Sequence, residues 1–376
     1  MSTPYEKVSV LFEKIFEALA WGRVPPPLYL TGCSILTGVR GESLAGVKRY
    51  EIDKPATSLK YAQVVAVAEI VLSLTRDRKS MSQRDIYYSL KTLFCKQYES
   101  NAIILDLGLM LGLKRHEMGL YPAAKGLIAG LCRFRFTDGT DVGEKEVPWT
   151  DCVHGDAGEG VRISSKWTSC PDGDLEMQIP TGGEGSLPKP THLIVVEKEG
   201  IFHRLVEDEF FISGVPCIIV TGCGYPDVPS RAAVARISQK YPFLQVVGLC
   251  DYNSYGLAVL LTYQLTSPAM RFEGEGFTCE QMRWLGLRGR DVELLQQHNP
   301  EFVLPSEHLQ VMSEKDVGHA RAMQKSKKLD LLPGPEAEAL RDELETMLDL
   351  RFKLELESLY ALGLDTLSNW ITERLS

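Results

Sequence analysis

The chain has 376 residues, of which 44% are hydrophobic and 24% charged, and it carries a formal net charge of −9. This length is enough for two or three domains with cores of their own, and the acidic balance argues against a general nucleic-acid coat protein. No apolar run reaches the roughly 18 residues of a membrane span, and the first residues lack the basic start of a signal peptide. We therefore expect an intracellular protein that does not contact a membrane.

Cysteine spacing and local charge further limit the class of protein. The nine cysteines stand at irregular intervals without a CxxC pair, which predicts reduced thiols rather than a zinc site or a disulfide framework. Charge is uneven along the chain: residues 76–138 carry eleven Lys or Arg against six Asp or Glu, whereas residues 336–357 are strongly acidic. A local basic region in an acidic protein can still bind a phosphate backbone.

The first predicted element is an amphipathic helix at residues 5–21, within an N-terminal region that we place at 1–58. Its expected apolar side consists of Val8, Leu11, Phe12, Ile15, Phe16 and Leu19. Two interpretations stay open: the helix packs on its own protein, or it binds in a groove of another protein chain. A Pro/Gly-rich break follows at 22–27, and the sequence from 28 to 58 does not indicate a firm assignment.

A small helical domain is expected at residues 59–150. Helices are predicted at 59–75, from Ser82 onward and at 100–113, followed by short extended pieces at 116–121 and 126–136. Three helices and a hairpin are typical of a winged-helix domain, in which the third helix reads a DNA groove and the hairpin is the wing.

The Ser82 helix separates two neighbouring tyrosines. Ser82 is a suitable N-cap, and Asp85 can complete a capping box. Tyr88 falls on the polar face, with Arg84 one turn before it and Lys91 nearly one turn after. The opposite, apolar stripe consists of Ile86, Tyr87, Leu90, Leu93 and Phe94. A phenol between two cations is unusual for a packing residue and suits a nucleophile directed at a phosphate.

The remaining chain divides into a loop-rich linker at 151–190, with short strands near 161–167 and 175–179, and an α/β domain at 191–376. Strands at 192–197, 216–221 and 244–250 alternate with helices at 200–208, 230–240 and 256–265. This order predicts a parallel sheet with helices on both faces, followed by a mainly helical C-terminal part. The fold class is thus α/β and multidomain.

Polar groups gather where these strands end. Glu197 and Asp251 each follow a hydrophobic strand, and a glycine-rich turn at 222–225 follows another. Each acid alone is more often a helix cap or a loop residue, but on one sheet edge the two can hold a hard divalent cation. Asn253 can add a neutral oxygen ligand, directly or through water.

Several segments together resemble a known family. The sequences VVEKE at 195–199 and DYNSYG at 251–256 resemble the two acidic motifs of a Toprim domain. With TGCGYPD at 221–227 and RDIYY at 84–88, the chain resembles the topoisomerase VI A-subunit family, whose eukaryotic members initiate meiotic recombination by cutting DNA. The resemblance spans about residues 60–300 and includes the segments at 125–130 and 284–287.

The resemblance implies a type IIB topoisomerase-like enzyme with a winged-helix domain and a Toprim domain. Tyr88 would attack a DNA phosphodiester and form a 5′-phosphotyrosyl bond, with Arg84 near the scissile phosphate. Two protomers would each cut one strand, pairing the tyrosine of one with the acids and Mg²⁺ of the other. The implied metal residues are Glu197, Asp251 and Asn253, and the implied contacts to double-stranded DNA are Lys125, Lys91 and Tyr225.

The chain departs from the family pattern at two positions. Asn253 stands where the family usually has a second aspartate, and Cys223 where it often has a lysine. A homodimer is implied for cleavage, although a monomeric resting form is compatible with the sequence.

Because no ATP-binding motif is found, ATP-dependent dimerisation would belong to a topoisomerase VI B-type subunit recruited by the helix at 5–21. Nuclear, chromosomal action is implied. The alternatives are a non-catalytic DNA-binding scaffold and an archaeal-type topoisomerase VI A-type protein.

Overall fold

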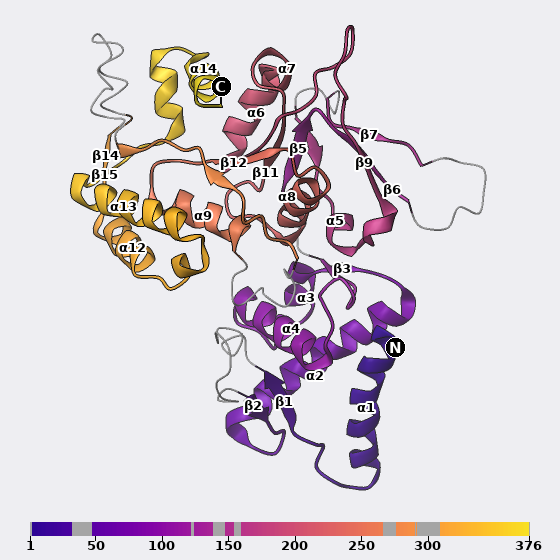
Figure 1. Ribbon diagram of the computed structural model, residues 1–376. Coiled ribbons are helices and arrows are strands. Elements are labelled where there is room, and N and C mark those ends of the chain that lie inside the picture. Colours follow the sequence, from indigo (N-terminus) through magenta and orange to yellow (C-terminus); the bar gives the residue numbers. More distant parts are fainter. Residues whose placement is uncertain are drawn as a thin grey trace. The chain divides into compact units, whose positions relative to one another are not determined.

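The computed structural model describes most of the chain as two compact units. The described residues are 2–31, 47–121, 124–137, 147–153, 159–265, 276–289, 291 and 309–375. One unit comprises residues 1–124 and 267–275, and the other comprises residues 125–266 and 276–376 (Figure 1). The domain limits expected from the sequence, at 58, 150 and 190, stay predictions, and the compact units divide after Ala124 instead.

The smaller unit is built around the helix α2, which packs against α1 and α4, while α3 packs against α4. A single apolar core joins these helices, with Val8 of α1, Val67 of α2, Ile86 of α3 and Ile104 of α4 all buried. The described elements are α1 (Pro4–Ala20), β1 (Leu28–Thr31), β2 (Val47–Tyr50), α2 (Pro55–Asp77), β3 (Met81–Ser82), α3 (Gln83–Ser89), α4 (Gln97–Leu111) and β4 (Leu120–Tyr121). The three helices expected in this region are present, but the Ser82 helix ends at Ser89, so Leu90, Leu93 and Phe94 of its expected apolar stripe lie beyond it.

Helix α2 has an apolar composition that its position explains. By length and composition alone it could cross a membrane, although no apolar run in the sequence predicted a span. Its residues Tyr61, Val64, Ala68 and Val71 are almost completely buried in the core of the smaller unit. Burial against α1 and α4 is the ordinary reason for such a composition in a core helix.

The hairpin expected at 116–136 is wrong. β4 pairs in parallel with β3, whereas β5 (Leu127–Gly130) pairs antiparallel with a strand of the larger unit, β11 (Cys217–Thr221). The physical reason is burial: all four residues of β5 are buried, as in an interior strand and unlike a solvent-exposed wing.

The larger unit contains a six-stranded sheet in the order β13-β12-β10-β11-β5-β8. β10, β11, β12 and β13 run parallel to one another. At one side of the sheet, β5 pairs antiparallel with β11, and β8 pairs antiparallel with β5. Its further elements are β6 (Arg133–Phe136), β7 (Thr150–Asp151), β8 (Val161–Arg162), α5 (Lys166–Ser169), η3 (Asp172–Asp174), β9 (Leu175–Gln178), β10 (His192–Val196), α6 (Glu199–Glu207), α7 (Phe210–Ser213), α8 (Val228–Lys240), β12 (Gln245–Leu249), α9 (Ser254–Gln264), β13 (Arg283–Trp284), β14 (Gln310–Val311), α12 (Glu314–Gln324), η5 (Leu329–Leu331), α13 (Gly334–Leu350), β15 (Phe352–Lys353), η6 (Leu356–Leu362) and α14 (Thr366–Leu375).

Two cores cover the two faces of this sheet, as the apolar strands predict. Along β10, Ile194 and Val196 enter a core with α6 and the C-terminal helices, while Leu193 and Val195 enter the core that contains α8. The strand expected over 161–167 is wrong in its second half, because residues 166–169 form α5. Trp167 of α5 is fully buried and packs edge-on against Phe134, so this segment contributes to a core.

Candidate active site

The first part of the candidate site is α3, which begins as the sequence predicts. The Asp85 N–H donates to Ser82 Oγ at 3.1 Å, and the Ser82 N–H donates to Asp85 Oδ2 at 3.3 Å. This reciprocal capping box fixes the start of the helix and therefore the direction of each face. Ile86 is fully buried on one side, while Tyr88 is 53% exposed on the other.

The two tyrosines of α3 have different surroundings. Arg84 Nη2 donates to the Tyr88 hydroxyl at 3.4 Å, and the guanidinium carbon lies 5.7 Å from the centre of the Tyr88 ring. This hydrogen bond and the positive charge of Arg84 lower the pKa of Tyr88, and Lys91 adds a smaller effect of the same sign. The Tyr87 hydroxyl instead donates to the Cys95 carbonyl oxygen at 3.3 Å. Tyr88 is therefore the exposed phenol of the pair, and the one that a cation contacts.

The second part is the edge of the large sheet where β10 and β12 end. These strands are direct parallel neighbours, so Glu197 and Asp251, which follow them, lie side by side. The Asp251 N–H donates to Glu197 Oε2 at 3.2 Å, and the Asp251 residue is only 3% exposed. Burial, and next the charge of Asp251, raise the pKa of Glu197 to about 7. The structure thus brings the two predicted acids together.

Asn253, two residues after Asp251, has a structural role as a helix cap. Its Oδ1 accepts a hydrogen bond from the Gly256 N–H at 2.8 Å and caps the N-terminus of α9. An N-cap oxygen of this kind satisfies one of the free N–H groups that begin every helix. The expected role of Asn253 as a metal ligand stays a prediction.

The backbone of the glycine-rich turn at 222–225 is hydrogen-bonded to the sheet edge that carries Glu197. The Gly224 N–H donates to the Glu197 carbonyl oxygen at 2.7 Å, and both Cys223 and Gly224 have positive φ, 50° and 86°. Lys125 binds the turn, because its Nζ donates to the Cys223 carbonyl oxygen at 3.1 Å. Tyr225 is 50% exposed, and burial and the charge of Glu197 raise its pKa. Lys125 and Tyr225 therefore belong to one loop cluster, and their predicted contacts to DNA are untested.

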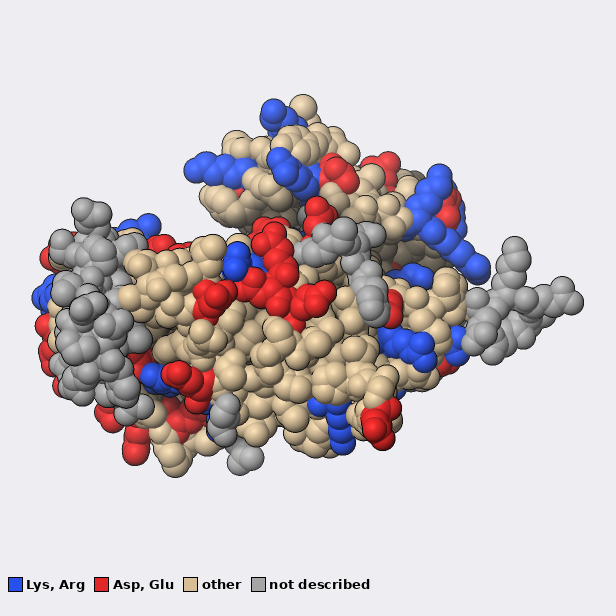
Figure 2. Space-filling view, turned by 90° about the horizontal axis from the view of Figure 1, so that it is seen from above, with Lys and Arg blue, Asp and Glu red and all other residues tan. Residues whose placement is uncertain are grey.

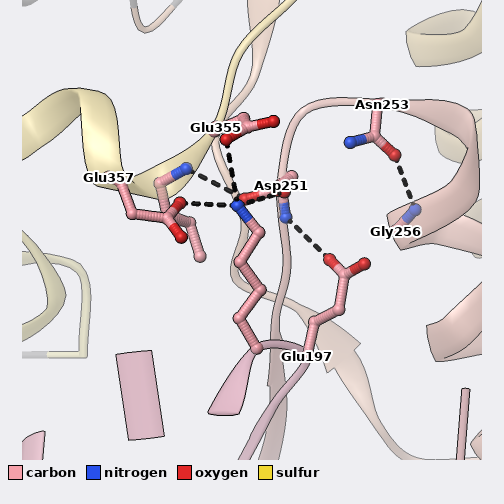
Figure 3. A network of polar contacts seen from close by, with 8 residues as sticks. Glu197, Asp251, Asn253, Gly256, Glu355 and Glu357 are labelled. Carbon is pink, nitrogen blue, oxygen red and sulfur yellow. Dashed lines mark hydrogen bonds and ion pairs between the residues drawn. The ribbon is translucent and has the colours of Figure 1, made fainter. Parts of the chain in front are cut away.

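Three residues that sequence reasoning missed complete the edge. Lys198 Nζ lies 2.8 Å from Asp251 Oδ2, 2.6 Å from Glu357 Oε2 and 3.4 Å from Glu355 Oε2 (Figure 3). Burial opposes the charge of Lys198, but its hydrogen bonds to Asp251 and Glu357 outweigh this effect and raise its pKa. Lys198 lies within the motif at 195–199, and the acidity of residues 336–357 was the signal for the two glutamates, but neither signal gave the position of these side chains.

Comparison with known proteins decides the family. Residues 192–375 match the family model for the Toprim domain of topoisomerase 6 A-subunit/Spo11 proteins, and residues 59–120 match the model "Type IIB DNA topoisomerase". Over 308 residues the chain is 30% identical to "Meiotic recombination protein SPO11-1" of Oryza sativa subsp. indica, covering 81% of this chain and 71% of that protein. The chain belongs to the topoisomerase 6 A-subunit/Spo11 family.

Further relatives support this membership across most of the chain. "Meiotic recombination protein SPO11-2" of Arabidopsis thaliana is 29% identical over 323 residues, 85% of this chain and 74% of the relative. "Meiotic recombination protein SPO11" of Mus musculus is 27% identical over 334 residues, 88% of this chain and 74% of the relative. Membership confirms the resemblance and the multidomain α/β fold, and it implies DNA binding, DNA cleavage of the topoisomerase type and association with B-type subunits.

Toprim domains typically bind a divalent metal ion, and the donor set of this Toprim domain suits one. Among the described residues, no three His, Cys, Asp or Glu side chains are grouped as a ready metal site. Two adjacent carboxylates at a strand edge are nevertheless the hard oxygen donors that Mg²⁺ prefers. The Lys198 ammonium lies against Asp251, so this carboxylate already pairs with one positive charge of the chain.

Figure 2 shows Asp and Glu side chains gathered in a patch, with a basic side chain beside them, on the face that it presents. Such a patch attracts cations and repels phosphate.

Proposed function

We propose that the chain forms meiotic-type DNA double-strand breaks by transesterification, with Tyr88 as the nucleophile. In this step the phenol oxygen loses its proton and bonds to phosphorus, the bond from phosphorus to the 3′-oxygen breaks, and the 3′-oxygen takes up a proton. The products are a 5′-phosphotyrosyl link and a 3′-hydroxyl. The supporting observation is that Tyr88 is exposed, hydrogen-bonded to Arg84 and lowered in pKa, whereas Tyr87 is bonded to a backbone carbonyl.

The side chains of Glu197 and Asp251 would hold Mg²⁺, with Asn253 as a further oxygen donor if its cap to Gly256 is shared. When bound, the ion would supply positive charge to phosphate oxygens during cleavage. Glu197 and Asp251 support this role by their adjacency at the strand edge and by their carboxylate chemistry.

The active assembly that we propose contains two copies of the chain, with Tyr88 of one copy acting beside Glu197 and Asp251 of the other. Lys91, Lys125 and Tyr225 would contact double-stranded DNA. Lys91 follows the end of α3, and Tyr225 is half exposed on the glycine-rich turn. The meiotic names of the relatives support a chromosomal, nuclear location.

A topoisomerase VI B-type subunit would bind to α1. Val8 and Ile15 of this helix are buried in the smaller unit, whereas Phe16 is 63% exposed, Leu19 53% and the following Trp21 72%. An exposed row of large apolar side chains on a helix whose other side is already packed is typical of a partner surface.

Two other functions are kept as outcomes of the test. An archaeal-type topoisomerase VI A-type protein would relax supercoiled plasmid DNA when its ATPase partner is present. A non-catalytic scaffold is favoured by two departures from the family pattern, Asn253 in place of an aspartate and Cys223 in place of a lysine. A scaffold would bind DNA without covalent capture.

The deciding experiment traps protein covalently bound to DNA. The full chain, with candidate B-type partners, is incubated with supercoiled or bent DNA and Mg²⁺, then denatured and probed for 5′-linked protein. We expect an adduct that Tyr88→Phe abolishes, Tyr87→Phe largely retains and Glu197→Ala removes. An adduct that survives Tyr88→Phe would contradict the assignment, and DNA binding without any adduct would favour the scaffold.

A further inference from the structure

Lys198 lies between one buried carboxylate and two more exposed ones. The Asp251 side chain is 4% exposed, whereas those of Glu355 and Glu357 are 45% and 40% exposed. The ammonium contacts all three, and in Figure 3 these carboxylates converge on one nitrogen. Small rotations of a flexible four-carbon side chain are enough to give up the inner carboxylate, Asp251, while keeping the outer ones, Glu355 and Glu357.

Both oxygens of Asp251 are engaged in this arrangement. Oδ1 accepts a hydrogen bond from the Leu356 N–H at 2.9 Å, and Oδ2 faces the Lys198 ammonium at 2.8 Å. A divalent ion on Oδ2 of Asp251 would have to share this oxygen with an ammonium group or replace that group. Two cations on one carboxylate oxygen repel each other strongly at a site shielded from water.

The outer acids are fixed beside the metal motif by backbone contacts. Tyr252, next to Asp251, pairs with Leu354 through two hydrogen bonds of 2.8 and 3.1 Å. Leu354 and Leu356 are buried, so the residues between and after them, Glu355 and Glu357, alternate outward. The C-terminal segment thus holds two carboxylates at a set position, without making either of them part of the buried pair.

We propose that Lys198 is a built-in counter-ion that pairs with Asp251 in the metal-free chain and, when a divalent ion binds, releases Asp251 while keeping Glu357 and Glu355. Lys198 thereby sets the metal affinity of the Toprim edge as a positioning residue, and Glu357 is its principal acceptor. This inference rests on the proposed metal role of Glu197 and Asp251. A purely structural role, in which Lys198 only ties the C-terminal segment to the sheet, makes a different prediction for metal affinity.

Mn²⁺ binding to the full chain, measured from the electron paramagnetic resonance signal of free Mn²⁺, separates the two roles. Lys198→Met removes the competing charge while keeping most of the side-chain bulk, and we expect binding at least about tenfold tighter. Lys198→Arg keeps the charge and should bind Mn²⁺ no more tightly than the unchanged chain. A structural tie predicts weaker or unchanged binding for Lys198→Met, and that result would overturn the proposal.

A double-mutant cycle tests the acceptor role. Glu357→Gln should weaken Mn²⁺ binding roughly three- to tenfold, because Lys198 then loses its outer partner and stays on Asp251. In the Lys198→Met background the same change should alter binding less than about twofold. An equal loss in both backgrounds would mean that Glu357 acts on the metal itself, and the proposal would fail. If Lys198→Met does not fold, Lys198→Gln, which also removes the positive charge, serves as the background for the same cycle.

Two controls keep the readout specific. Glu338→Gln removes an exposed acid from α13 and should leave Mn²⁺ affinity unchanged. Asp251→Asn should abolish the binding that the other variants modulate. If the unchanged chain binds no Mn²⁺ that Asp251→Asn removes, the metal role proposed for this edge is wrong, whereas a normal Asp251-dependent site that ignores Lys198→Met overturns only the inference about Lys198.

Discussion

Arg84 donates a hydrogen bond to the Tyr88 hydroxyl from one helical turn away, at 3.4 Å. The four-residue spacing on α3 makes this contact available without any tertiary partner. Because both side chains are exposed, solvent weakens the interaction, and its importance lies in the acidity of the phenol rather than in stability.

Arg84→Gln should therefore raise the pKa of Tyr88. A phenol with a lowered pKa loses its proton at lower pH, so the rate of adduct formation should level off at lower pH in the unchanged chain than in Arg84→Gln. The titration is measured by NMR of ring-labelled tyrosine, with Tyr88 assigned from the Tyr88→Phe spectrum. Arg84→Lys is the matched variant and should shift the profile less, and identical profiles for all three chains would contradict the electrostatic role of Arg84.

The α3 site was predictable because it depends on local periodicity. A capping residue fixes where the helix begins, and 3.6 residues per turn then separate Tyr88 from Ile86. The meeting of Glu197 and Asp251 was predictable for a similar reason, since neighbouring parallel strands end at one edge.

The partners of Lys198 were not predictable in this way. Glu357 lies 159 residues further along the chain, and no periodicity relates positions so far apart. The placement of β5 failed for the same reason, because a buried apolar run of four residues does not indicate which sheet it joins. Long-range pairing of this kind is decided by tertiary packing, which a single sequence does not show.

Gly126→Ala should destabilise the larger unit because the backbone there packs too closely for a side chain. An added Cβ would overlap Ser230 Oγ and lie 3.0 Å from the Thr221 carbonyl oxygen. Ser230 cannot yield freely, since its Oγ donates to Asp227 Oδ1 at 2.6 Å. We expect a loss of about 1–3 kcal/mol in the free energy of unfolding, measured by denaturant titration.

Gly200→Ala is the matched control for this prediction. Gly200 lies in the first turn of α6 with open space around its added Cβ, so alanine should leave stability unchanged or raise it by up to about 1 kcal/mol. Equal losses for the two variants would show that the close approach at Gly126 is not the cause.

Asn253 should tolerate aspartate better than alanine. Its Oδ1 caps α9, and loss of an N-cap side chain typically costs about 1 kcal/mol, which should appear as faster hydrogen exchange in the first turn of α9. Aspartate keeps the cap, favours the helix N-terminus by its charge, and adds an acid near Asp251. Asn253→Asp should therefore retain slow exchange and tighten Mn²⁺ binding, and slow exchange in Asn253→Ala would refute the capping role.

Substitutions on the buried and exposed sides of α1 should have different effects, one on stability and the other on partner binding. Ile15 is 7% exposed and belongs to the core of the smaller unit, so Ile15→Ala should lower its stability by about 2–4 kcal/mol. Phe16 and Leu19 are more than half exposed, so Phe16→Ala with Leu19→Ala should leave the unfolding midpoint nearly unchanged. If the B-type subunit binds to α1, the double substitution should instead lower the affinity for this partner by at least about tenfold, measured by pull-down titration or calorimetry.

Glu13→Gln, a change of a charged α1 residue, is the matched control and should change neither the unfolding midpoint nor the affinity for the partner by more than a small amount. Normal partner binding by the doubly substituted chain would place the B-type contact elsewhere on the molecule.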